Sequence, residues 1–106
     1  GSEAAQRLVG FLLTIQERYP DVWATLSEVS VLSPTDARVH LTDGTPELLV
    51  RYDRAGAQIE NLKAFVARGP RLAELAYIDL RYENQVVAGR TATDAPTALV
   101  PSHPVF

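Results

Sequence analysis

Three polar residues near the middle of the chain have the side chains that hydrolysis requires. His40 is a general-base candidate, and Asp36 and Asp43 are nearby carboxylates that could orient its ring. Residues 37–42 alternate between apolar and polar types, which predicts a strand with His40 on its outer face. A histidine in that position is more often solvated than catalytic. A small hydrolytic or ligand-binding domain using His40 with Asp36 or Asp43 is therefore kept as an alternative hypothesis.

Other familiar reactive groups are missing from the sequence. Cysteine is absent, so there is no thiol nucleophile or thiolate metal site, and the only other histidine, His103, lies between prolines. None of the serines stands in a GxSxG setting, and no phosphate loop or dinucleotide fingerprint is visible. We expect no catalytic residue, metal or cofactor, and therefore a protein that is not an enzyme.

The composition is that of one small globular domain. The chain has 106 residues, of which 46% are hydrophobic and 22% charged, enough for a single core. Its net charge of −3, with Lys and Arg scattered singly, provides no basic stripe for a phosphate backbone. Nucleic acid is therefore not an expected partner. Residues 1–2, Gly-Ser, have the form of a cleaved expression tag, so a membrane-spanning segment upstream would be missing.

The pattern of apolar residues predicts an α+β fold. Helical spacing is expected at residues 3–19 and 57–68, and strands at 28–32, 37–42, 47–52 and 77–90. Asp43-Gly44 is a strong hairpin signal between the second and third strands. We expect an antiparallel-dominated β-sheet with two amphipathic helices packed on one face. Residues 91–106, with three prolines and no periodicity, are expected to form an irregular tail.

The last expected strand is the candidate binding element. Its residues alternate between two faces. Ile78, Leu80 and Tyr82 would lie on the buried face, and Tyr77, Asp79 and Arg81 on the outer face. As the final sheet element it is expected at an edge, where main-chain N–H and C=O groups stay available to another chain. Residues 83–85 are either a bulge in one long strand, which we favour, or the turn of a hairpin. The charges of Asp79, Arg81 and Glu83 could equally guard the edge against pairing.

The same stretch carries a resemblance to a known family. Ile78-Asp79-Leu80-Arg81-Tyr82, followed by Val86-Val87-Ala88, resembles the "IDLR-aromatic … VAV" signature in the C-terminal β domain of the bacterial cell-division protein FtsQ/DivIB. An amphipathic helix, a strand with Leu26, Val29 and Val31, an alternating strand into Asp43-Gly44, and a second helix precede it in the same order. The resemblance covers residues 3–90, which would form the FtsQ-like β domain.

That resemblance implies a function. FtsQ/DivIB proteins are single-span proteins of the cell inner membrane, with a POTRA domain and a β domain on the extracytoplasmic side. They are non-catalytic divisome scaffolds in septum formation and bind FtsB/DivIC and FtsL partners by adding a strand to their last strand. The resemblance implies these partner-binding residues here: Arg81, Tyr82, Asn84, Val86, Ala88 and Gly89. A further alternative is a self-associating domain in which the same edge pairs with its own copy.

Overall fold

The computed structural model describes residues 2–90 and has the expected α+β architecture. The expected tail at 91–106 lies outside the described residues. In chain order the elements are α1 (Ser2–Arg18), α2 (Pro20–Thr25), β1 (Leu26–Val31), β2 (Asp36–Leu41), β3 (Glu47–Arg51), the 3-10 turn η1 (Tyr52–Arg54), α3 (Ala55–Ala67), the 3-10 turn η2 (Leu72–Glu74), β4 (Tyr77–Asp79) and β5 (Val87–Gly89). No helix among the described residues is both long enough and apolar enough to cross a bilayer.

The strands of residues 2–90 form one sheet in the order β1-β2-β3-β4-β5. β1, β2 and β3 are an antiparallel meander, and β4 and β5 are also antiparallel. Gly44 has a φ of 90° in the turn between β2 and β3, a backbone conformation that favours glycine. β3 and β4 are parallel because α3 carries the chain back across the sheet before β4 begins. The sheet is therefore mixed, although antiparallel pairs dominate as predicted.

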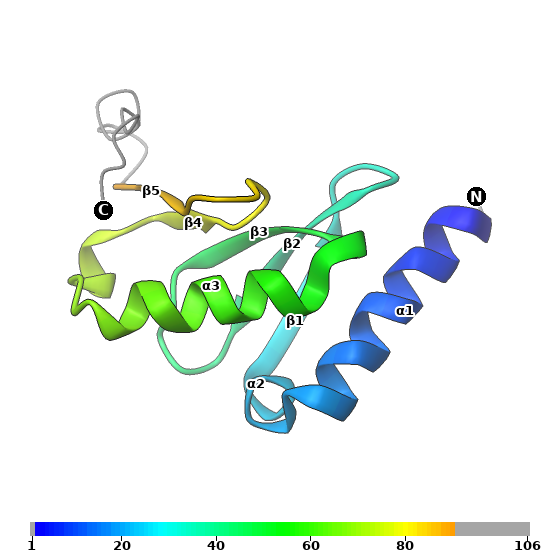
Figure 1. Cartoon of the computed structure of the whole chain (residues 1–106), viewed down its shortest axis with the longest axis horizontal. Helices are drawn as coiled ribbons and strands as arrows, with labels where there is room; N and C mark the ends of the chain where they lie inside the picture. Colours follow the sequence, from blue (N-terminus) through cyan, green and yellow to red (C-terminus); the bar gives the residue numbers. More distant parts are fainter. Residues whose placement is uncertain (1, 91–106) are drawn as a thin grey trace.

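The core lies between the inner face of the sheet and the two long helices. Figure 1 shows α3 lying across the sheet, and α1 on the opposite side of the molecule from β4 and β5. α1 contributes Phe11 and Ile15, and α3 contributes residues at helical spacing such as Ile59 and Leu62. The sheet meets them with alternate residues of its strands: Ala37, Val39, Leu48, Val50, Ile78 and Ala88. This arrangement confirms the two amphipathic helices expected from the sequence.

Residues 77–90 differ from the single long strand that we favoured. They form a hairpin, in which Ile78 of β4 pairs with Ala88 of β5 and Asp79 pairs with Val87. The chain leaves the sheet after Leu80, whose N–H donates to Leu49 O at 2.8 Å, and returns at Val87. β4 is therefore enclosed between β3 and β5, and β5 forms the edge at this end of the sheet.

Three side chains are more exposed than their sequence pattern predicted. Tyr82 was expected on the buried face with Ile78, but it lies beyond the end of β4 and is 47% exposed. The alternation of residues 28–32 predicts that Val31 points into the core with Val29, but it ends the edge strand β1 and is 60% exposed. Val66 of α3 is 40% exposed. For Tyr82 the expected strand period is wrong, because β4 ends at Asp79. Val31 and Val66 belong to regular elements but are only partly covered by other described residues.

Candidate functional site

The candidate site is built around β5, which we call the docking edge (Val87–Gly89). β5 hydrogen-bonds only to β4 within the described part of the chain, so its other side has no strand beside it. An extended segment of another chain could pair there, since edge strands carry unpaired main-chain groups. The docking edge is shorter than the strand that we expected from the sequence.

A close contact between Tyr77 and Gly89 shapes the docking edge. The two residues are directly paired across β4 and β5. A Cβ atom added at Gly89 would lie 2.2 Å from Cε1 of the Tyr77 ring, so only glycine leaves room for that ring. Burial raises the pKa of the Tyr77 hydroxyl, and the nearby charge of Asp79 adds to that effect. The ring therefore covers the backbone of β5 on the outer face of the sheet.

Asp79 and Arg81 form a partly buried ion pair next to the docking edge. Arg81 Nε donates to Asp79 Oδ1 at 2.9 Å, and its Nη2 donates to Asp79 Oδ2 at 2.8 Å. Its Nη1 also donates to Asp36 Oδ2 on β2 at 3.0 Å. The hydrogen bonds to Asp79 raise the pKa of the guanidinium, which stays charged. Asp79 is 4% exposed, so it is not a solvated charge of the kind that the alternative of a guarded edge would need.

This pair turns the chain out of the sheet after β4. The Arg81 N–H donates to Asp79 Oδ1 at 3.1 Å, and the Arg81 carbonyl accepts a hydrogen bond from Arg54 Nη2. Arg81 is thus held to β2, β4 and η1. Its role as a partner contact remains a prediction. Such a contact would use the guanidinium N–H groups that are not engaged with Asp79 or Asp36.

A groove lies between α3 and the segment that precedes β5. It has a volume of about 380 Å³ and is lined by one face of α3 and by the turn of the hairpin. The α3 wall consists of Asn61, Ala64, Phe65 and Arg68, and the other wall of Glu83, Asn84, Gln85 and Val86. The lining combines the buried ring of Phe65 with polar groups from both walls, which suits a side chain with an apolar body.

The structure brings together most of the residues that the resemblance implied. Asn84 and Val86 line the groove, and Ala88 and Gly89 belong to the docking edge itself. Tyr82 is exposed at the start of the same hairpin turn. Arg81 is set apart from them by its ion pairs. The sequence analysis did not identify the α3 wall as part of the site. Its residues, from Asn61 to Arg68, are separated by three, one and three positions, which is the spacing of one helix face.

The hydrolytic alternative is not supported by its own geometry. His40 Nε2 lies 3.3 Å from Glu47 Oε1, and its Nδ1 lies 3.8 Å from Glu28 Oε1. The two aspartates that we considered are engaged elsewhere. Asp36 binds Arg81, as described above.

Asp43 belongs to the hairpin turn. Its Oδ1 accepts hydrogen bonds from the Thr45 hydroxyl at 2.6 Å and from the Thr45 N–H at 3.0 Å, and these bonds lower the pKa of Asp43. In residues 2–90 no three acidic, histidine or cysteine side chains are grouped closely enough to hold a metal ion. Because Asp36 binds Arg81 and Asp43 binds Thr45, neither carboxylate is placed to orient His40.

Comparison with known proteins adds no relative. No family model matches the chain, and neither the curated proteins nor the solved structures include a match.

Proposed function

We propose that this domain is a non-catalytic extracytoplasmic part of a divisome scaffold, which binds cell-division partners of the FtsB/DivIC and FtsL type by strand addition to β5. The sequence resemblance to FtsQ/DivIB motivates the choice of partners. The observation that carries the proposal is the position of the docking edge, an open sheet edge that lies directly beside the groove. Each half of that site supplies a different part of the recognition.

The open edge supplies main-chain hydrogen bonds. A net main-chain hydrogen bond contributes roughly 0.5 to 1.5 kcal/mol, and a strand as short as β5 forms only a few of them. Pairing alone would therefore give weak binding. Alternate side chains of an added strand project to the inner face of the sheet, toward the groove, where burial of an apolar side chain adds to affinity.

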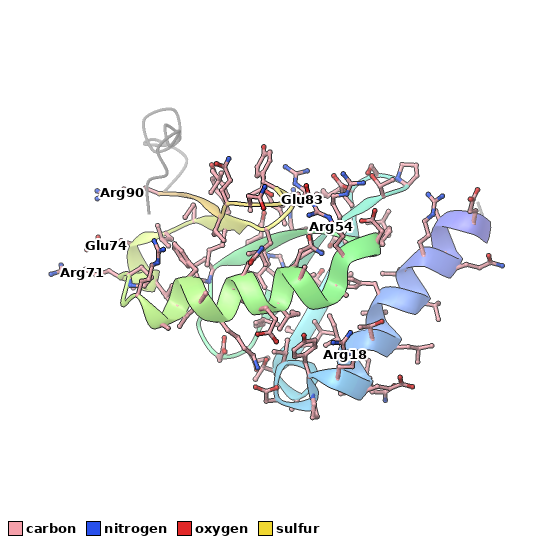
Figure 2. The ribbon with its side chains drawn as sticks, in the orientation of Figure 1. Arg18, Arg54, Arg71, Glu74, Glu83 and Arg90 are labelled. Atoms are coloured by element: carbon pink, nitrogen blue, oxygen red, sulfur yellow. The ribbon has the colours of Figure 1, made fainter. Side chains whose placement is uncertain are left out.

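Charged groups stand at both ends of the docking edge. Figure 2 shows Glu83 at the turn and Arg90 just beyond the end of β5. Opposite charges at the two ends of a strand favour one orientation of an incoming strand with matching charges. We expect a partner segment with a basic residue near Glu83 and an acidic residue near Arg90.

Localisation follows from the same proposal. In FtsQ/DivIB proteins the β domain lies outside the cytoplasm and is tethered to the inner membrane by an upstream helix. We propose the same placement for this domain, with the tether in a segment upstream of residue 3. Expression of the natural gene with a reporter fused after Arg90 tests the side of the membrane directly.

The test of binding uses Val86, which directly precedes β5 and lines the groove. A synthetic peptide from the FtsB/DivIC-type partner of the same organism is titrated into wild type and Val86→Pro by calorimetry. We expect the proline to weaken binding by at least about tenfold, because it removes a main-chain donor and narrows the allowed backbone. Circular dichroism of the variant shows whether the fold persists. Unchanged affinity in a folded variant would overturn β5 as the docking strand.

Tyr82→Lys tests whether side chains beside the edge contribute. Tyr82 is 47% exposed, and Leu13 is a matched control with 48% exposure. Leu13 belongs to α1, which lies on the opposite side of the molecule from β4 and β5 (Figure 1). We expect Tyr82→Lys to weaken peptide binding and Leu13→Lys to leave it unchanged. Equal effects of the two changes would mean that added charge, rather than this position, causes the loss.

A further inference from the structure

The second edge of the sheet, β1, has open main-chain groups that can be assigned to particular residues. β1 pairs with β2 in an antiparallel register that includes Ser30 with Arg38 and Val31 with Ala37. The N–H of Leu32 donates to Asp36 O at 3.0 Å in the same register. Hydrogen bonding alternates along an antiparallel strand, so every second residue before Leu32 also faces β2. The N–H and C=O groups of Val29 and Val31 therefore point away from the sheet.

This edge carries few of the devices that keep edges from pairing. β1 contains no lysine, arginine or proline, and its only charged residue is Glu28. A bulge between Leu26 and Glu28 distorts the start of the strand and leaves residues 28–32 regular. At the regular end, Val31 is 60% exposed and Leu32 39% exposed. This edge therefore combines exposed apolar side chains with main-chain groups that have no partner strand among residues 2–90.

We propose that β1 pairs with β1 of a second copy of this chain, antiparallel and about a two-fold axis at Ser30. In this register Val29 of each copy lies opposite Val31 of the other, so the outward groups of both valines are satisfied. Ser30 meets Ser30 of the second copy on the outer face, and Glu28 meets Leu32. The pairing is isologous and closes as a dimer, as a two-fold axis requires.

The side chains of β1 favour the register with the two-fold axis at Ser30 over the register with the axis at Val29. Glu28 does not meet its own copy, so no like charges face each other. Val31 gains cover from Val29 of the second copy on the inner face. A two-fold axis at Val29 would instead place Val31 opposite Ser27, which lies in the bulge. The axis at Ser30 avoids the bulge and pairs valine with valine.

The dimer would leave β5 free in each copy, because β1 and β5 are at opposite ends of the sheet order. A continuous ten-stranded sheet would then offer one docking edge at each end. The interface is a single pair of strands and smaller than a standard protein interface, so we expect weak, concentration-dependent association.

Sedimentation equilibrium of the domain from low micromolar to millimolar concentration tests the pairing. We expect the mass of the wild type to rise from 11.6 kDa toward twice that value. Val31→Pro removes an N–H that points outward and leaves the β1–β2 bonds intact, so the variant keeps its fold and stays monomeric. Val31→Lys places a guard charge at the same position and gives the same result even if the proline variant fails to fold.

Two controls assign the effect to β1. Val66→Lys makes the same chemical change at an exposed valine on α3 and is expected to dimerise as the wild type does. Val86→Pro disturbs the approach to β5 and is expected to leave dimerisation unchanged, which keeps this result separate from partner binding. A wild type that stays monomeric throughout would overturn the proposal. A dimer that persists in Val31→Lys, or is lost equally in Val66→Lys, would overturn it as well.

Discussion

At the scale of single residues, the Asp79 carboxylate is the most consequential charge near the docking edge. It is 4% exposed, and each of its oxygens accepts a hydrogen bond from Arg81. A buried carboxylate is tolerated when it is paired and becomes costly when its partner is removed. The pair therefore fixes the turn after β4, while the cost of desolvating its two charges offsets much of their attraction.

Replacing Arg81 with methionine is expected to destabilise the domain. The change leaves Asp79 without its cation and also releases Asp36. Removing one partner of a fully buried pair costs about 3 to 5 kcal/mol, and because the Arg81 side chain is 30% exposed we expect roughly 1 to 3 kcal/mol. Urea unfolding measures the loss. Arg71→Met, at an 82% exposed arginine paired with Glu74, is the control and should change little.

Gly89 and Tyr77 are expected to be energetically coupled. Gly89→Ala places a Cβ 2.2 Å from Cε1 of the Tyr77 ring, so the ring or the strand must move, at a cost of about 1 to 3 kcal/mol. In a Tyr77→Ala background that clash disappears, and the same change should cost much less. A double-mutant cycle by urea unfolding measures the difference. Equal costs in both backgrounds would show that the ring does not restrict position 89.

Tyr52 links stability to alkaline pH. Its hydroxyl is buried without a hydrogen-bond partner among the described residues, and burial, followed by the charge of Asp36, raises its pKa. Above pH of about 10 the unfolded chain loses this proton before the folded protein does, so the free energy of unfolding falls as pH rises.

The Tyr52→Phe variant tests this linkage. We expect its free energy of unfolding at neutral pH to equal or exceed that of the wild type, since the change removes an unpaired buried hydroxyl. Between pH 9 and pH 11 its stability should also fall less steeply. Tyr19 and Tyr77 have raised pKa values for the same main reason, burial, so part of the slope remains. A variant with the wild-type slope would contradict the assignment.

At the scale of elements, one side chain joins α3 to the end of β3. Gln58 is 1% exposed; its Oε1 accepts from the Arg51 N–H at 2.8 Å, and its Nε2 donates to the carbonyls of Arg51 and Arg54 at 2.7 and 2.8 Å. The side-chain amide pairs with the Arg51 backbone as a neighbouring strand would, at the point where β3 ends and η1 begins. The apolar pattern of α3 gave no sign of this buried polar position.

Gln58→Met keeps the size of the side chain and removes all three bonds. Each buried group left without a partner costs about 1 to 3 kcal/mol, and partial access of water at Arg51 and Arg54 reduces the sum, so we expect a total of roughly 2 to 4 kcal/mol. Thermal unfolding measures the effect. Gln16→Met, at an exposed glutamine of α1, is the matched control and is expected to be neutral.

The elements were predictable where one period held along a segment. α1, β2, β3 and α3 each follow one period and were predicted within a few residues of their observed bounds. Residues 77–90 were not, because their apolar pattern continues through the turn of the hairpin. Arg81, which is paired with Asp79 at this turn, is also held by Asp36, which is 45 residues away in sequence. A local pattern carries no information about such a contact.

At the scale of the whole molecule, the crossover through α3 decides where binding can occur. Because α3 places β4 beside β3, Ile78 and Asp79 of the IDLR run lie inside the sheet, and β5 forms the edge on that side. The same helix forms one wall of the groove next to that edge. The resemblance pointed to Asn84, Val86, Ala88 and Gly89, whereas the α3 wall was recognised only from the three-dimensional structure.

Amide hydrogen exchange of the domain with and without a saturating FtsB/DivIC-type partner peptide tests the central claim most directly. The domain is kept at low micromolar concentration so that β1 stays unpaired. We predict slower exchange at residues 86–90, and unchanged exchange at residues 28–32, because added hydrogen bonds at β5 protect that hairpin. A peptide that binds while residues 86–90 exchange as fast as before would contradict docking at β5.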